Sequence, residues 1–432
     1  MKLTFENCWM ILPNRTVGFG DLDTDGACIS RITLRDPADL NPNASPSRLI
    51  LPGLINCHGH TAMTLVRGLG GGLPLQRWLE EEIFPVEAKM TPADVAAGTA
   101  WGVREMLAGG TTAVADMYDF PAACAESFAA AGFKARVNRV GLSFIPGRLE
   151  ECISFTRDFN ASAQSPLSLN PNTVLADLCI HSEYLTDEPF CRALAAANNA
   201  ELKRPLHVHV SETEKEHREC IERHGKTPIA YLAETGLLDQ GGYAAHCVWC
   251  TDDDFRIMAE KGVSLIHNPT SNMKLGSGFA RVPRAMELGV NVALGTDGCA
   301  SNDNLDMFEE MHLASLIHKG LAKDPTVLSA WDVIEMATVN GAKALGMSDA
   351  GELAVGKAAD LCIVDLDRSH LTPCLDIPSL VVNSMHASDV VMTVVDGVVR
   401  YEKGADDPTL AAAKSAFLSS VRNIGLNPLW CD

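Results

Sequence analysis

The sequence lacks any apolar run long enough to cross a membrane. A bilayer-spanning helix needs roughly 20 consecutive apolar residues, and every apolar run in this 432-residue chain is shorter. The first seven residues include Glu6 and lack the apolar core of a signal peptide. We therefore expect no membrane partner and a cytoplasmic location.

Basic residues are also scarce. Lysine and arginine together number 35 against 55 aspartates and glutamates, which gives a formal net charge of -20. Such a surface repels the phosphate backbone of nucleic acids, so we expect no nucleic-acid partner. An anionic small substrate is not excluded, because local arginines can reverse the field inside one pocket.

A second Cys-x-x-Cys pair is missing. Cys247 and Cys250 form the only one, whereas structural zinc usually needs two such pairs. We expect the 14 cysteines to be reduced thiols, mostly small buried hydrophobic residues. The sequence also shows no internal repeat, and its 47% of hydrophobic residues suffices for a sizeable core.

What the sequence does contain is an alternation of short β-like runs with helical stretches between residues 54 and 350. Eight strands with intervening helices predict an α/β fold, a closed (β/α)8 TIM barrel, with a doubly wound open sheet as the alternative. The expected strands are residues 54–58, 111–117, 135–141, 175–181, 205–210, 243–246, 263–268 and 290–297.

Both chain ends have a different pattern, typical of strands and turns. Residues 28–34 and 390–401 are β-like, residues 21–26 are predicted to form a turn, and residues 408–422 a terminal helix. We therefore expect a small β-sandwich domain made from residues 1–53 and 351–432, with the barrel of residues 54–350 between them.

Two histidines stand at the end of the first expected barrel strand. His58 and His60 follow the apolar residues 54–57. Residues two apart in extended backbone face the same way, so both imidazoles can point at one spot. In a barrel that spot is the carboxyl-terminal mouth, where barrel enzymes build their active sites.

His209 and Asp297 end two further expected strands. A carboxylate after a buried strand costs free energy unless something pairs with it, although Asp297 could also cap a helix. Three imidazoles and one carboxylate, with an open position for water, suit zinc. The same ligands could hold iron, manganese or nickel. The sequence thus predicts one divalent metal, expected to be zinc, bound by His58, His60, His209 and Asp297.

Two more histidines lie near these ligands. His246 either ligates or hydrogen-bonds the water that the metal activates; we expect the second, because four ligands already fill the protein's share of the site. His207 is expected to be a hydrogen-bonded core histidine. Residues 175–181 contain no lysine that could be carbamylated to bridge two metals, which favours a single metal.

These motifs together resemble the amidohydrolase superfamily, and within its cytosine/adenosine-deaminase-like branch the methylthioadenosine/S-adenosylhomocysteine deaminase group. The resemblance covers nearly the whole chain. It begins at residues 51–60 (LPGLINCHGH) and ends at residues 351–361 (GELAVGKAADL), which look like the return into the β-sandwich. It implies hydrolytic deamination of an adenosine-type nucleoside.

The resemblance also implies roles for pocket residues. Glu212, three residues after His209, would move protons between water and a ring nitrogen, although a helix-start glutamate is the alternative. Trp78 would cover the nucleoside, Glu87 would accept hydrogen bonds from the ribose hydroxyls, and His181 would contact the base. Ser301 matches another pocket position.

An arginine matches the position that serves the substrate's amino-acid tail. Arg148 suits a tail carboxylate because its planar fork donates two parallel hydrogen bonds. Arg136 is a candidate companion, and Arg139 competes for that role. Residues 160–172, rich in Ser, Asn and Pro, look like a loop insertion that could reshape the tail pocket.

The expected reaction converts an adenosine-type nucleoside, such as 5'-methylthioadenosine or S-adenosylhomocysteine, to its inosine form and ammonia. Glu212, His246 and Asp297 are the expected catalytic residues. The alternatives are deamination or dechlorination of another N-heterocycle (guanine, pterin or triazine) and, more remotely, a non-catalytic scaffold of the same fold. The sequence leaves open whether the chain forms a homo-oligomer.

Overall fold

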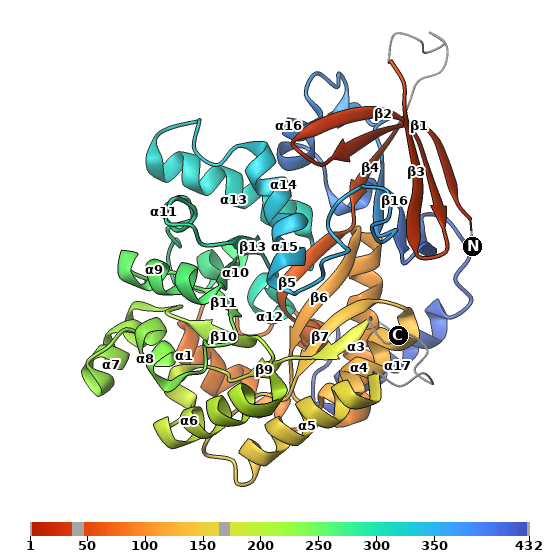
Figure 1. The fold of residues 1–432 in the computed structure, drawn as a ribbon. Coiled ribbons are helices and arrows are strands. Elements are labelled where there is room, and N and C mark those ends of the chain that lie inside the picture. The colour runs from red at the N-terminus through yellow and green to blue at the C-terminus, as the bar shows by residue number, and fades with distance from the viewer. Residues whose placement is uncertain (1, 37–46, 164–172, 430–432) are drawn as a thin grey trace. The chain divides into compact units, whose positions relative to one another are not determined.

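The computed structural model describes residues 2–36, 47–163 and 173–429, which group into two compact units (Figure 1). The first unit comprises Met1–Asn56, Arg104–Ala113 and Asp306–Asp407, and the second comprises Cys57–Val103, Val114–Leu305 and Pro408–Asp432. No helix within the described ranges combines the length and apolar character that a membrane crossing demands. The domain boundaries expected at residues 53 and 350 stay a prediction.

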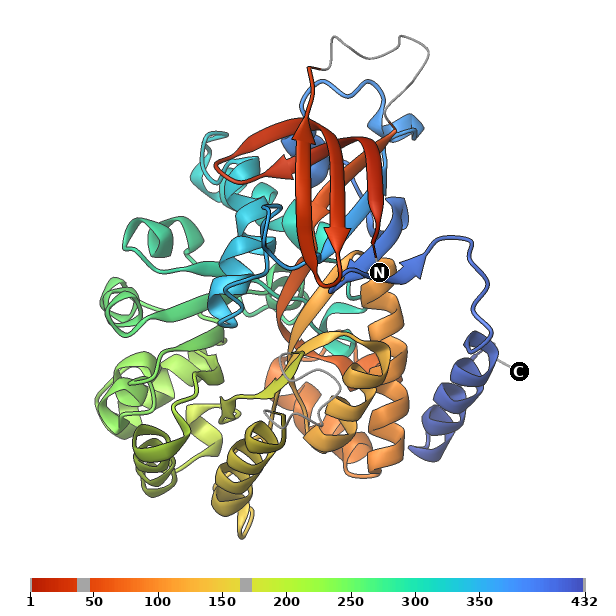
Figure 2. The same cartoon turned by 45° about the vertical axis from the view of Figure 1, so that its right-hand side comes forward.

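Both chain ends contribute to one seven-stranded sheet in the first unit (Figure 2). Its order is β17-β16-β15-β4-β1-β2-β3, and its neighbours are antiparallel except for the parallel pair β1 and β4. The strands are β1 (Thr4–Leu12), β2 (Thr16–Asp25), β3 (Cys28–Leu34), β4 (Arg48–Pro52), β15 (Leu361–Asp365), β16 (Val390–Val395) and β17 (Val398–Glu402).

One hydrophobic core unites the early and late strands of this sheet. Met10 and Leu22 from the beginning of the chain pack in the same cluster as Ile363 and Val394 from its end, all fully buried. A domain made from both chain ends is therefore present, as the sequence predicted.

The turn expected at residues 21–26 is wrong for most of its length, because β2 continues to Asp25. Aspartate is depleted in strands, but here cross-strand partners compensate. The carboxylate of Asp23 accepts hydrogen bonds from Thr4 Oγ1 at 2.7 Å and Arg31 Nε at 2.6 Å. Gly26, with φ of 58°, and Ala27 make the tight connection to β3.

The barrel strands form two five-stranded parallel rows, β14-β5-β6-β7-β8 and β13-β12-β11-β10-β9. β8 and β9 continue one another across Asp177, as do β13 and β14 across residues 295–296, so the rows close into the expected eight-stranded barrel. The strands are β5 (Leu54–His60), β6 (Thr111–Met117), β7 (Lys134–Asn138), β8 (Val174–Ala176), β9 (Leu178–Cys179), β10 (Leu206–Val210), β11 (Gly242–His246), β12 (Val263–His267), β13 (Val292–Leu294) and β14 (Asp297–Gly298).

Local sequence signals set the ends of the helices. Thr251 caps α9 (Asp252–Lys261) in a capping box with Asp254, and Gly262 in the left-handed conformation ends that helix. The other helices of eight or more residues are α3 (Pro92–Ala108), α4 (Pro121–Ala131), α5 (Arg148–Ala163), α6 (Glu188–Ala197), α7 (Glu214–His224), α8 (Pro228–Thr235), α13 (Met307–Ala322), α14 (Ala330–Ala337) and α17 (Leu410–Asn423). The shorter helices are α1 (Leu75–Trp78), α2 (Phe84–Glu87), α10 (Pro269–Lys274), α11 (Val282–Glu287), α12 (Cys299–Asn302), α15 (Val339–Ala344) and α16 (Ile377–Asn383).

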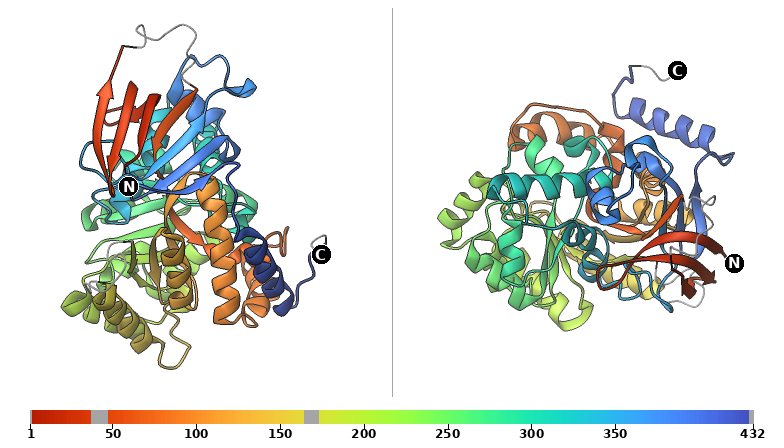
Figure 3. Two further views of the ribbon diagram at one scale, coloured as in Figure 1. Left: turned by 90° about the vertical axis from the view of Figure 1, so that its right-hand side faces the viewer. Right: turned by 90° about the horizontal axis from the view of Figure 1, so that it is seen from above.

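Two predicted segments near the chain's surface can be placed in part. The terminal helix expected at 408–422 is α17, which lies beside α3 with the rings of Trp101 and Phe417 stacked at 5.1 Å (Figure 3). The loop expected at 160–172 begins later than predicted, because α5 continues to Ala163. Residues 164–172 of that loop lie outside the described residues.

A buried polar network lies inside the barrel. The carboxylate of Asp177 accepts hydrogen bonds from the hydroxyl of Tyr243 at 2.8 Å and from Arg204 Nε at 2.9 Å, and Arg136 Nε lies 3.9 Å away. Burial and the adjacent Asp177 raise the pKa of Tyr243 well above its usual value, so its hydroxyl stays protonated and donates.

We expect Tyr243→Phe to lower the free energy of unfolding of the barrel by about 1–3 kcal/mol, because a buried carboxylate loses a donor. Urea unfolding monitored by circular dichroism measures the change. Tyr401→Phe is the matched control, since the Tyr401 hydroxyl makes no hydrogen bond within the described residues. Equal unfolding midpoints for the two variants would contradict the assignment.

Candidate metal centre and active site

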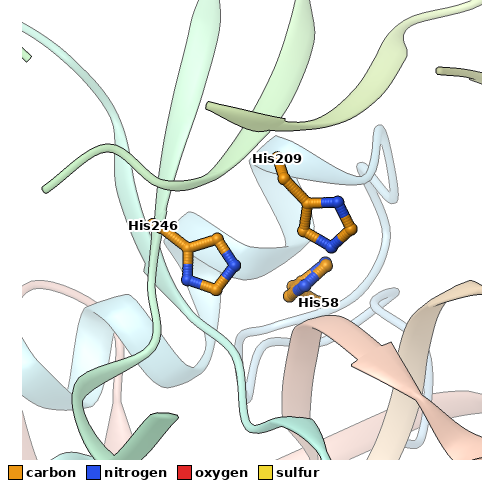
Figure 4. Close-up of side chains that lie close together, drawn as sticks. All are labelled: His58, His209 and His246. Atoms are coloured by element: carbon orange, nitrogen blue, oxygen red, sulfur yellow. The ribbon is translucent and has the colours of Figure 1, made fainter. Parts of the chain in front are cut away.

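The four predicted ligands converge at one mouth of the barrel, with His58 and His60 on β5, His209 on β10 and Asp297 at the start of β14. Asp297 Oδ1 lies 3.1 Å from His60 Nε2 and 3.4 Å from His58 Nε2, and His209 Nε2 lies 3.3 Å from His60 Nε2. His58 and His209 face one another in Figure 4. The structure therefore brings together side chains that are up to 239 residues apart in the sequence, from position 58 to position 297.

Each imidazole is held by its other nitrogen. His209 Nδ1 lies 2.8 Å from the carbonyl oxygen of His181, and His60 Nδ1 contacts the carbonyl oxygen of Met117. His58 Nδ1 lies 2.8 Å from Nε2 of His207, which is thus a hydrogen-bonded core histidine. These bonds fix the ring orientations, so that all three Nε2 atoms face the same centre.

Asp297 is buried and held in an unusual backbone conformation. Its φ is 64°, a left-handed value that aspartate tolerates better than most residues. Ser271 Oγ donates to Oδ2 at 2.6 Å, and the amide of Gly298 donates to Oδ1 at 2.8 Å. The carboxylate is therefore aimed at the imidazoles by contacts on either side.

The electrostatics of the cluster favour a positive charge beside Asp297. Burial would raise the pKa of Asp297, but His58 and His60 hold it well below its usual range. Burial lowers the pKa of His58 to about 4 and that of His209 well below 6.5, so both rings are neutral and offer lone pairs. Burial also opposes a charge on His60, yet Asp297 raises its pKa to about 9. Imidazole nitrogens and one carboxylate fit a divalent metal.

His246 lies beside this centre. Its Nδ1 lies 2.9 Å from Asn272 Oδ1, and its Nε2 lies 3.8 Å from Glu212 Oε2 and 4.0 Å from Asp297 Oδ2. One ring nitrogen of His246 also lies within 4.8 Å of a ring nitrogen of His58 and of His209, and the three side chains are close together in Figure 4. The position suits both alternatives, ligation and a hydrogen bond to water.

Glu212 is a buried carboxyl group with an oriented backbone. The carboxylate of Glu216 accepts the amides of Ser211 and Glu212, each at 2.7 Å, and so fixes the loop after β10. Burial raises the pKa of Glu212 above its usual value. A carboxyl group that holds a proton more readily than usual, near a metal centre, can both accept and donate it.

A cavity of about 550 Å³ opens onto the candidate metal centre. It is large enough for a nucleoside-sized ligand and mostly apolar, as small-molecule sites usually are. Beside the predicted ligands His60, His209 and Asp297, its walls include the predicted site residues Trp78, Glu87, His181, Glu212, His246 and Ser301.

Glu87 and Trp78 are held in place at the cavity wall. The hydroxyl of Tyr118 donates to Glu87 Oε1 at 2.7 Å, and burial raises the pKa of Glu87 above its usual value. Trp78 Nε1 donates to the carbonyl oxygen of Leu69 at 3.1 Å. This bond fixes the indole ring at the cavity wall. One oxygen of Glu87 thus has a protein donor, while the group still lines the cavity.

The two predicted tail-binding arginines are not among the residues that line this cavity. Arg136 lies with Asp177 and Tyr243 inside the barrel, because its position on β7 directs it there. Arg148 is buried, and its Nη1 donates to Asp119 Oδ1 at 3.1 Å and to the carbonyl oxygen of Val140 at 2.8 Å. Tail binding by either arginine stays a prediction that these placements do not favour.

Several residues that support the site were not foreseen from the sequence. Glu216, Ser271 and Asn272 orient Glu212, Asp297 and His246, and Tyr118 orients Glu87. The signal for Ser271 and Asn272 was their position just after an apolar strand, in the polar stretch 268–272. Tyr118 directly follows β6, but its pairing could not be foreseen, because its partner Glu87 ends helix α2, 31 residues earlier.

Comparison with known proteins agrees with this geometry. The model of the amidohydrolase family matches residues 49–400. A 5-methylthioadenosine/S-adenosylhomocysteine deaminase from Acetivibrio thermocellus is 43% identical over 356 residues, which cover 82% of this chain and 81% of that protein. A 5'-deoxyadenosine deaminase from Methanosarcina mazei is 42% identical over 374 residues, covering 85% of this chain and 84% of that protein.

Solved structures show the same fold. An adenosine deaminase from Xanthomonas campestris with bound zinc has a TM-score of 0.85 at 30% identity and covers 96% of this chain and 97% of that one. A zinc-bound atrazine chlorohydrolase from Arthrobacter aurescens also reaches 0.85, at 22% identity over 97% of this chain and 99% of that one, a likeness of fold alone. The resemblance expected from the sequence is confirmed: this chain belongs to the amidohydrolase family.

Proposed function

We propose that this chain is a zinc-dependent hydrolase that deaminates an adenosine-type nucleoside, such as 5'-methylthioadenosine, S-adenosylhomocysteine or 5'-deoxyadenosine, to its inosine form and ammonia. The observation that carries the proposal is the cavity in which Glu212 and Asp297 flank His246 while Glu87 stands on the wall. The deaminases among the relatives support it.

In this proposal His58, His60, His209 and Asp297 hold the zinc ion, which supplies water activated as a nucleophile by lowering its pKa toward about 7. The fit rests on the donor chemistry, three imidazoles and a carboxylate within one buried cluster. The absence of a lysine from residues 175–181 favours one ion over two.

The two carboxyl groups divide the proton transfers. Glu212 donates its proton to a ring nitrogen of the base, which makes the neighbouring carbon more electrophilic. Asp297 accepts the proton that the attacking water loses and passes it to the amino group, which leaves as ammonia. Glu212 regains a proton from the new hydroxyl group as that oxygen becomes the carbonyl, and Nε2 of His246 orients the water. Opposite pKa shifts of two carboxyl groups in one site, raised for Glu212 and lowered for Asp297, suit such a division.

The cavity wall orients the nucleoside. The carboxylate of Glu87 accepts hydrogen bonds from the two ribose hydroxyls, and Trp78 covers the sugar. His181, two residues after β9, and Ser301, in α12, contact the base.

The principal alternative is a hydrolase that acts on guanine, a pterin or a triazine. Glu87 argues against it, because a bare heterocycle has no vicinal diol for this carboxylate. A non-catalytic scaffold is the remote alternative, disfavoured by the complete set of ligands together with Glu212.

Metal removal tests the role of the ion. We expect dialysis against a chelator to abolish deamination of 5'-methylthioadenosine, monitored by ultraviolet absorbance, because the water then loses its activator. One equivalent of zinc per chain should restore it. Full activity in protein shown to be metal-free would contradict this role.

Glu212→Gln removes the proposed proton donor with little change of shape. We expect kcat to fall about 10²- to 10⁴-fold, while the zinc content measured by mass spectrometry stays at the wild-type level. Glu214→Gln, at an exposed position two residues away, is the control. A Glu212→Gln variant with near-normal kcat would rule out this donor.

Glu87→Gln tests recognition of the ribose. We expect kcat/KM for adenosine to fall about 10- to 100-fold, the effect of losing a hydrogen bond to a charged group, with little change for 2',3'-dideoxyadenosine. Glu80→Gln, exposed on the same segment, is the control. Equal losses for both nucleosides would mean that Glu87 does not recognise the diol.

A further inference from the structure

One wall of the cavity is apolar and only partly covered. Phe144 is 66% exposed, Phe84 40% and Phe120 37%, although all three line the cavity. Large apolar side chains in such positions stabilise a ligand by contributing apolar surface that binding buries. The other apolar residues that line this part of the cavity are Val140, Leu142, Ile145 and Leu185.

A compact group of charges borders this wall. Asp119 lines the cavity, and its Oδ1 accepts from Arg148 Nη1 at 3.1 Å and from Arg139 Nη1 at 3.2 Å. Glu151 Oε2 accepts from Arg139 Nη2 at 2.7 Å and Nε at 3.0 Å and lies 3.2 Å from Arg148 Nε. Two guanidinium groups are thus balanced by two carboxylates.

Two arginines near a pocket would usually attract a ligand carboxylate, but here both arginines are bonded to carboxylates of the protein. A carboxylate is recognised best by a guanidinium fork with two parallel donors. Here the Nε and Nη2 donors of Arg139 are both directed at Glu151, and Nη1 of each arginine is directed at Asp119. The charged group that reaches the cavity wall is the carboxylate of Asp119, not either arginine.

The position of Asp119 relates it to the 5' end of a nucleoside. It directly follows Tyr118, whose hydroxyl bonds the proposed ribose acceptor Glu87. With the base at the metal centre and the ribose at Glu87, the 5' substituent reaches the wall beyond, where Asp119 and the exposed phenylalanines lie.

We infer that Asp119 is a specificity-determining residue that neutralises Arg139 and Arg148 and so selects nucleosides with an uncharged, apolar 5' substituent over those whose tail carries a carboxylate. This inference rests on the proposed function and narrows its substrate class. A tail carboxylate would meet the like charge of Asp119 and would have to displace it from both arginines.

The test compares wild type with Asp119→Asn, which keeps the shape and removes the charge. The substrates are 5'-methylthioadenosine, S-adenosylhomocysteine and 5'-(2-carboxyethylthio)adenosine, whose tail is a carboxylate without an ammonium group. We expect wild type to prefer the methylthio compound. The variant should raise the ratio of kcat/KM for each carboxylate substrate to that for 5'-methylthioadenosine about five- to tenfold, as for one unit charge at close range.

Two further variants locate the effect. Glu150→Gln neutralises an exposed neighbour of Glu151 on α5 and should leave the ratio unchanged. Arg139→Gln in the Asp119→Asn background should reverse the gain, because the Nη1 donor of Arg139, which no longer faces a charged Asp119, is what binds the carboxylate. Thermal unfolding and 5'-methylthioadenosine turnover show that each variant is folded.

The outcomes separate this inference from the proposed function. If wild type deaminates none of these nucleosides, nor adenosine, the proposed function fails. If it deaminates them but the ratio is unchanged in folded Asp119→Asn, or wild type already prefers the carboxylate tails, then Asp119 does not exclude them. In that case the arginines would bind the tail carboxylate even while bonded to Asp119 and Glu151, and the inference would be overturned.

Discussion

A buried carboxylate among imidazoles is the interaction on which the rest of this site depends. Asp297 is almost inaccessible to water, and an ionised carboxylate in such a place is costly unless a positive charge compensates for it. The surrounding rings of His58, His60 and His209 are each fixed by a second contact, so they cannot turn away. A divalent cation at this point would neutralise the carboxylate and accept the imidazole lone pairs. Its binding would explain why several polar side chains are buried together at the barrel mouth.

The surroundings of that centre divide the chemistry by environment. Burial makes Glu212 hold its proton more strongly, whereas histidines keep Asp297 ionised, so two like groups in one cavity take opposite roles. Farther along the wall the cavity becomes apolar, and the charges that border it are balanced between Asp119, Glu151 and two arginines. In the proposed function, the chemistry takes place at the candidate metal centre and this apolar part of the wall distinguishes substrates by charge and shape.

Much of this could be predicted from the sequence, because strand ends in a barrel meet at one mouth. The β-runs therefore placed His58, His60, His209 and Asp297 together before any contact was known. Features that depend on partners from distant loops could not be predicted. Asp23 stays in a strand only because Arg31 and Thr4 face it. The arginine predicted to receive a substrate tail, Arg148, is instead engaged by Asp119, and residue type alone cannot reveal that pairing.

The most direct test of the central claim is the position of the ion itself. Anomalous diffraction from crystals of the zinc-loaded protein, together with zinc absorption spectroscopy, locates the metal and counts its ligands. The account predicts one zinc per chain between His58, His60, His209 and Asp297, with nitrogen and oxygen neighbours at about 2.0–2.2 Å. A zinc ion bound elsewhere, or two ions sharing the site, would contradict it.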